Sequence, residues 1–105
     1  MRKTFRTYHL AVEFYGQAEG ISLPRFLKDQ LQRASSSVVL NLAEGRGRET
    51  MADQRRFYRI AFGSLRECQA ILDLCSSANP EAVATADRLA AHIYKLIKNV
   101  KAPSR

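Results

Sequence analysis

The sequence predicts an all-α fold: an antiparallel, up-down bundle of four helices. Apolar residues recur at alternating spacings of three and four in four separate segments, which is the helical period. Glycine and proline stand mostly between these segments, so each stretch is long and uninterrupted. A length of 105 residues suits one domain with one modest core. We therefore expect a single domain over residues 1–105.

The first two helices are expected at roughly residues 5–17 and 23–44. Ser22 is suited to cap the second helix, and Pro24 suits a first turn, where a missing N–H is harmless. Gly45 is typical of a residue just past a helix end. The expected core stripes are Phe5, Tyr8, Val12 and Tyr15 in the first helix, and Leu27, Leu31, Ala34, Val38 and Asn41 in the second.

The third helix is expected at roughly residues 51–76 and the fourth at 80–100. Thr50 and Asp53 have the spacing of a capping box, and Asn79 offers a cap before a first-turn proline. The expected stripes are Tyr58, Ala61, Leu65, Cys68, Leu72 and Cys75, then Val83, Ala86, Ala90, Ile93, Ile97 and Val100. Because the connections are short, consecutive helices should be antiparallel neighbours.

Small and polar residues interrupt the stripes. Residues 35–37 are all serine, and the third helix contains Gly63 and Ser64. Glycine inside a helix costs ~1 kcal/mol relative to alanine, which a close approach of two backbones could offset. Asn41 lies on a core stripe and needs a hydrogen bond there. A buried asparagine that fixes helix register is favoured over one that contacts a ligand.

The composition favours a cytoplasmic protein with a polyanionic partner. The formal charge of +7 suits nucleic acid, an anionic membrane or an acidic protein. No apolar run approaches the ~20 residues of a membrane span, and no signal-peptide pattern follows the basic N-terminus. Cys68 and Cys75 would lie roughly 10.5 Å apart along a helix, too far for a disulfide, so we expect buried thiols.

The sequence contains no pattern typical of an enzyme, a metal site or a cofactor site. A di-metal site in a bundle needs Glu-x-x-His pairs, and neither His9 nor His92 has a glutamate three residues before it. The two cysteines lack a C-x-x-C pattern. Residues 45–48 (Gly-Arg-Gly-Arg) lack the end of a phosphate loop. We expect no catalytic residue, no metal and no cofactor.

Positive charge is concentrated in the middle of the chain. Residues 46–66 carry a net charge of +4, whereas residues 67–94 carry −3. Arginine binds phosphate bidentately, so the arginines of this segment are candidate phosphate contacts. They are Arg46, Arg48, Arg55, Arg56, Arg59 and Arg66, and three of them (Arg55, Arg59 and Arg66) share one helical face. The alternative is a solvated face, or one that pairs with acids of a neighbouring subunit.

Two motifs point to a known family. Residues 30–45 follow the pattern Q-x-x-R-A-x-x-S-[IV]-x-x-N-[IL]-A-E-G, and residues 57–67 follow F-x-x-x-A-x-G-S-x-x-E. Together they resemble the 23S ribosomal RNA intervening-sequence protein family. The shared positions are Arg33, Ser37, Asn41, Glu44, Gly45, Gly63, Ser64 and Glu67. We interpret them as packing or interface residues.

The resemblance implies a four-helix bundle that assembles into a ring-like homopentamer. It also implies a link to nucleic acid, because members include proteins encoded inside rRNA intervening sequences. A related branch is the accessory variability protein of diversity-generating retroelements, which binds nucleic acid and the reverse transcriptase. No enzymatic activity is established for the family.

Our leading hypothesis is a non-enzymatic, self-assembling bundle that binds RNA or DNA mainly through phosphate contacts. The alternative is an accessory subunit whose basic face docks an acidic protein, such as a reverse transcriptase, without nucleic-acid specificity of its own. A hydrolytic enzyme is disfavoured, since no nucleophile, base and orienting acid form a recognisable set.

Overall fold

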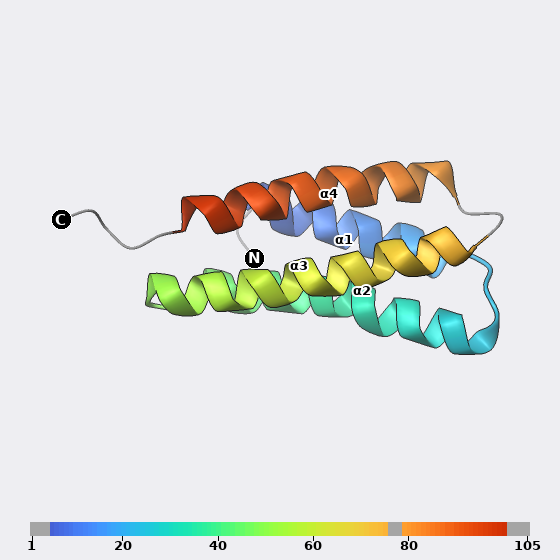
Figure 1. Ribbon diagram of the computed structural model, residues 1–105, viewed down its shortest axis with the longest axis horizontal. Helices are drawn as coiled ribbons and strands as arrows, with labels where there is room; N and C mark the ends of the chain where they lie inside the picture. Colours follow the sequence, from blue (N-terminus) through green and yellow to red (C-terminus); the bar gives the residue numbers. More distant parts are fainter. Residues whose placement is uncertain (1–4, 76–78, 101–105) are drawn as a thin grey trace.

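The computed structural model describes residues 5–75 and 79–100. These residues form four helices: α1 (Arg6–Glu19), α2 (Arg25–Arg46), α3 (Met51–Leu74) and α4 (Pro80–Asn99). Consecutive helices are antiparallel, and α1 also packs against α4, so the four helices enclose one core (Figure 1). The predicted all-α bundle is confirmed. The α2–α3 turn and the C-terminal end of α4 lie at the same end of the molecule.

The helix ends follow the predicted caps at α3 and α4. Thr50 Oγ1 accepts a hydrogen bond of 3.1 Å from the backbone N–H of Asp53. Asn79 Oδ1 accepts from the N–H groups of Glu81 (2.8 Å) and Ala82 (3.3 Å). The expected end of the third helix at residue 76 lies outside the described residues, and α3 ends at Leu74.

Two predicted helix boundaries are wrong. Ser22 does not cap α2: Pro24 occupies the cap position in an extended conformation, and no side chain caps this end. Instead, Lys28 Nζ donates to the carbonyls of Glu19 (2.5 Å) and Ile21 (2.7 Å), which ties the connection to the start of α2. Gly45 does not end the helix either, because α2 continues through Arg46.

The core is built by one buried stripe from each helix. In α3 the predicted stripe is buried apart from the half-buried Cys75. In α2 the predicted Leu31, Ala34 and Val38 are buried, but Leu27 and Asn41 are only half-buried and Leu42 completes the stripe instead. In α1 and α4 it is rotated: Val12 and Val83 are exposed. The residues that face the core there are Thr7, Ala11, Phe14 and Ala18, then Ala82, Thr85, Ala86, Leu89 and Ile93.

A short polar chain crosses the α2–α3 contact. The hydroxyls of Ser37 and Ser64 share a hydrogen bond of 2.7 Å. Asn41 Nδ2 donates to the Ser37 carbonyl (2.9 Å) and hydroxyl (3.1 Å). Asn41 therefore has a structural role, because it holds the serine that joins the two helices.

Glycine allows a close contact between α2 and α3 at position 45. A Cβ placed on Gly45 would lie 2.6 Å from Tyr58 Cε1 and 3.2 Å from Phe57 Cβ, so the Tyr58 ring packs directly on the α2 backbone. Gly63, in contrast, faces open space on α3 and does not bring the helices together. None of the helices in the described ranges is long and apolar enough to cross a lipid bilayer.

Candidate nucleic-acid interface

The turn between α2 and α3 gathers most of the candidate arginines at one end of the bundle. Backbone hydrogen bonds join Gly47 N–H to the Glu44 carbonyl (3.2 Å) and Arg48 N–H to the Gly45 carbonyl (3.1 Å). Gln54 Nε2 then donates to the Arg48 carbonyl at 3.1 Å, which ties the turn to α3. The turn is thus fixed at both sides, so the flanking arginines keep a defined arrangement.

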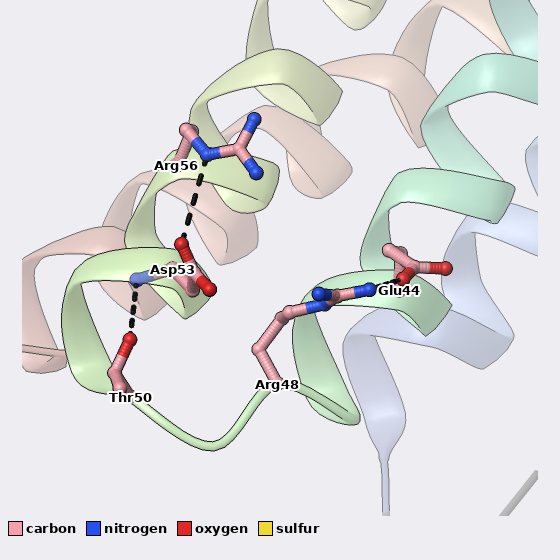
Figure 2. Close-up of polar contacts among 5 residues, drawn as sticks. All are labelled: Glu44, Arg48, Thr50, Asp53 and Arg56. Atoms are coloured by element: carbon pink, nitrogen blue, oxygen red, sulfur yellow. Dashed lines mark hydrogen bonds and ion pairs between the residues drawn. The ribbon is translucent and has the colours of Figure 1, made fainter.

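Two of these arginines pair with nearby carboxylates. Arg48 forms an ion pair with Glu44, and Arg56 Nε lies 3.8 Å from Asp53 Oδ1 (Figure 2). The hydrogen bond and negative charge of Glu44 raise the pKa of Arg48. Both guanidinium groups also contact Phe57, with Cζ atoms 5.0 and 4.4 Å from the ring centre. The Phe57 ring therefore contacts two cations.

Two further arginines connect the turn to the outermost described residues. The Arg46 guanidinium lies over the Phe5 ring at 4.5 Å, and its charge opposes the rise that burial produces in the pKa of Tyr58. Arg55 Nε donates a hydrogen bond of 2.7 Å to the Val100 carbonyl at the end of α4. Arg55 is half-buried, so this contact makes it a structural residue as well as a charged one.

The centre of the candidate interface is a shallow groove on α3, which we call the arginine groove. It has a volume of about 420 Å³ and is lined by Ala52, Arg55, Arg56, Arg59 and Ile60. Arg59 is exposed and forms no ion pair with any carboxylate of the described residues. Three arginines therefore face one groove whose lining contains no acidic side chain.

Arg66 lies apart from the arginine groove. It lines a second groove, between α3 and α4, together with Asp73 and Asp87. Arg66 Nη1 donates to Gln69 Oε1 at 3.0 Å, and Gln69 Nε2 donates to Asp87 Oδ1 at 3.0 Å. The predicted arginine stripe is thus divided into a wholly basic part and a part with acidic surroundings.

The motif residues fall into three places. Ser37, Asn41, Gly45 and Ser64 lie at the α2–α3 contact, Glu44 lies at the turn, and Arg33, Gly63 and Glu67 are exposed on α2 and α3.

Sequence reasoning missed two features. It gave no role to Phe57 as the support of two guanidinium groups, although the phenylalanine lies one residue from Arg56. It also treated His9 and His92 as isolated, whereas both line one groove between α1 and α4. In the predicted bundle α1 lies antiparallel beside α4, and this arrangement could have indicated that the two histidines lie close together. Within the described ranges, no group of three or more His, Cys, Asp or Glu residues could hold a metal ion.

The chain was compared with models of known protein families. The model of the 23S rRNA-intervening sequence protein family matches residues 6–102, which include all four helices. The chain belongs to this family. The resemblance inferred from the two motifs is thereby confirmed, and the 23S rRNA-intervening sequence protein family is one with no known catalytic activity. A search of the curated proteins found no match to the chain.

Proposed function

We propose that this member of the 23S rRNA-intervening sequence protein family is a non-enzymatic, self-assembling bundle that binds RNA or DNA in the cytoplasm. The observation that carries the proposal is the arginine groove, where three arginines line one surface without a carboxylate. Arginine contacts to phosphate position a protein on nucleic acid but carry no sequence information. Binding should therefore be weakly sequence-selective and strongly salt-dependent.

Arg56 and Arg59 are the proposed principal phosphate contacts. Arg59 is exposed and outside any ion pair of the described residues. Arg56 is held by Asp53 only at 3.8 Å, and both side chains are largely exposed. An exposed pair of this kind is worth about 0–1 kcal/mol, so a phosphate can replace it. Arg46 and Arg48 would extend the contact around the turn.

The test is equilibrium binding to an RNA hairpin and to a DNA duplex, titrated across salt concentration. Each phosphate contact contributes about 0.7–0.9 to the slope of log affinity against log salt. Arg59→Ala should reduce the slope by roughly that amount and Arg56→Ala/Arg59→Ala by about twice as much. The matched control is Arg25→Ala, which removes an exposed arginine paired with Asp29 at the start of α2. Arg25→Ala should leave the slope unchanged.

Two results would overturn the proposal. If Arg25→Ala and Arg59→Ala change the slope equally, the arginine groove is not the contact surface. If wild-type protein binds neither ligand at low salt, nucleic-acid binding fails altogether. That second result would favour an accessory subunit that docks an acidic protein.

Self-assembly is proposed to use an apolar groove between α1 and α2. Val12, Tyr15, Ser36, Val39 and Leu40 line this groove, whose volume is about 240 Å³. Leu40 is 65% exposed and Val12 is 43% exposed, so burial of both side chains at a subunit contact would have a favourable free energy. A closed ring such as a pentamer joins two different patches of neighbouring copies. We propose that this groove is one of the two.

The oligomer is tested by native mass spectrometry of Leu40→Glu beside Leu74→Glu. Leu74 is 70% exposed at the far end of α3, so it controls for the loss of any exposed leucine. Leu40→Glu should shift the protein toward the monomer, and Leu74→Glu should not. A wild-type protein that stays monomeric at tens of micromolar would contradict the proposal.

A further inference from the structure

A second basic surface lies between α1 and α4, on helices that do not line the arginine groove. Arg6, His9 and Glu13 of α1 face Arg88 and His92 of α4 across a groove of about 510 Å³. An adjoining groove of about 450 Å³ is also lined by His92, together with Thr7, Ala91, Lys95, Leu96 and Asn99. His92 lines both grooves, and we call the two together the histidine groove.

Positive charge dominates the histidine groove even when both imidazoles are neutral. Arg6, Arg88 and Lys95 are its fixed cations, and Glu13 is the one carboxylate among the residues that line it. The described residues contain no ion pair between Glu13 and either arginine. Glu13 instead accepts a hydrogen bond of 3.4 Å from Gln17 on its own helix. The two guanidinium groups are therefore not neutralised within the groove.

We propose that the histidine groove binds a tetrahedral oxyanion of the phosphate type, and that protonation of His9 and His92 strengthens this binding. The phosphate is either part of a nucleic-acid strand or part of a small phosphorylated molecule, and the experiment below separates these two sources. This site is additional to the proposed nucleic-acid contact on α3 and does not depend on it. It lies on other helices and uses other side chains.

The chemistry of the lining supports an anion. Guanidinium groups donate in a fixed fork that matches phosphate oxygens, and an imidazolium adds two N–H donors. The imidazole side chain ordinarily changes charge between about pH 5 and 8, whereas arginine and lysine stay charged throughout. Protonation of both histidines adds two positive charges to three. An anion that binds the protonated groove better must bind more tightly as the pH falls.

The experiment compares affinity at about pH 5.5 and about pH 8 at constant ionic strength. The probes are inorganic sulfate and a short oligothymidylate, whose charges are both constant across this range. For wild-type protein we expect about tenfold tighter binding at the lower pH, which corresponds to about 1.4 kcal/mol of binding free energy. The His9→Gln/His92→Gln variant should lose the pH dependence, so that its affinities at the two pH values agree. Both histidines are exposed, so the variant should fold, which circular dichroism checks.

The two probes separate the two sources of phosphate. The quantity compared is the ratio of the affinities at the lower and the higher pH. A tenfold ratio for both sulfate and oligothymidylate supports a site that also binds small ligands. A tenfold ratio for oligothymidylate alone supports a site for a nucleic-acid strand. The inference is overturned if the ratio is near one for both probes, or if it survives in the double histidine variant. Arg59→Ala distinguishes this site from the arginine groove, because it should weaken oligothymidylate binding equally at both pH values.

A second measurement follows the histidines directly. In proton NMR spectra, sulfate should move the midpoints of both imidazole titrations to higher pH in wild-type protein. Arg6→Gln/Arg88→Gln should abolish this movement, while the control Arg25→Gln should retain it. Midpoints that do not respond to sulfate or to oligothymidylate would refute the assignment of these side chains to the site.

Discussion

At the scale of single residues, two glycines of the motif have opposite environments. Gly45 is buried under the Tyr58 ring, and Tyr58 itself is only 3% exposed, so the ring has no free space to move into. Gly63 lies in a helix of equal regularity, yet nothing stands within 4 Å of a Cβ added there. Both glycines have negative φ, so only the surroundings distinguish them.

We predict that alanine has opposite effects at these two glycines. Gly45→Ala should destabilise the bundle by about 1–3 kcal/mol, because the added methyl overlaps a buried ring. Gly63→Ala should stabilise it by about 0.5–1 kcal/mol through the lower backbone entropy of the unfolded chain. Urea denaturation measures both. Equal effects would show that the Tyr58 contact does not determine the requirement for glycine at position 45.

A second prediction at this scale concerns Cys68. Burial raises the pKa of its thiol to about 12, and the charge of Glu67 adds to the rise. In the unfolded chain the thiol loses its proton near pH 8.5. Between these values the unfolded state binds fewer protons than the native state, so stability must fall as the pH rises.

Cys68→Ala should remove this part of the pH dependence. The difference between wild type and variant should change by at most about 1.4 kcal/mol per pH unit above pH 9. Urea denaturation between about pH 8 and 10.5 measures it, and any cavity left by the alanine shifts the whole curve without changing its slope. Parallel curves would mean that the Cys68 thiol ionises as easily in the folded protein as in the unfolded chain.

At the scale of helices, the C-terminal end of α4 depends on an arginine of α3. The last carbonyls of a helix have no partner within the helix, and Val100 receives its hydrogen bond from Arg55 at 2.7 Å. Arg59, one turn further along α3, has no such contact among the described residues. Two arginines that look equivalent on one helical face thus have different tasks.

We predict that Arg55→Ala loosens α4 whereas Arg59→Ala does not. Loss of a hydrogen bond from a charged donor should lower stability by about 1.5–3 kcal/mol. Amide hydrogen exchange should become faster in the last turn of α4, from Leu96 to Val100. An identical exchange pattern in both variants would show that the Arg55 contact does not hold this turn.

The helices were predictable because their periodicity and caps are local properties of the chain. Thr50 and Asn79 cap α3 and α4 as their spacing indicates. The face that each helix buries was less predictable. α1 carries two overlapping apolar stripes, and the sequence could not show that Phe14 rather than Val12 would face the core. That choice depends on neighbouring helices.

The candidate site was predictable in composition but not in arrangement. Charge density located the arginines, whereas the separation of Arg66 from Arg59 depends on the acids that α4 brings alongside α3. The meeting of His9 and His92 joins residues far apart in the chain and required the packing of α1 on α4.

At the scale of the whole molecule, most helix contacts join helices that are consecutive in the sequence. Among the described residues, the α1–α4 pair is the one helix contact between distant parts of the chain. Helical bundles with such local contacts fold in microseconds to milliseconds. Stopped-flow refolding should therefore recover the helical signal in a fast phase that is independent of protein concentration. A slower, concentration-dependent phase should report assembly. If helix appears only in the concentration-dependent phase, the isolated subunit is not stable.

The position of the outermost described residues has a practical consequence for labelling. Phe5 lies under Arg46 and Val100 accepts from Arg55, so both lie at the end of the bundle that contains the α2–α3 turn. A fluorophore or purification tag attached at either of them would crowd the arginine groove and distort titrations with nucleic acid. The connection between α1 and α2 lies at the opposite end of the bundle, and Ser22 is exposed there (Figure 1). A reporter dye coupled at residue 22 would leave the arginines unobstructed.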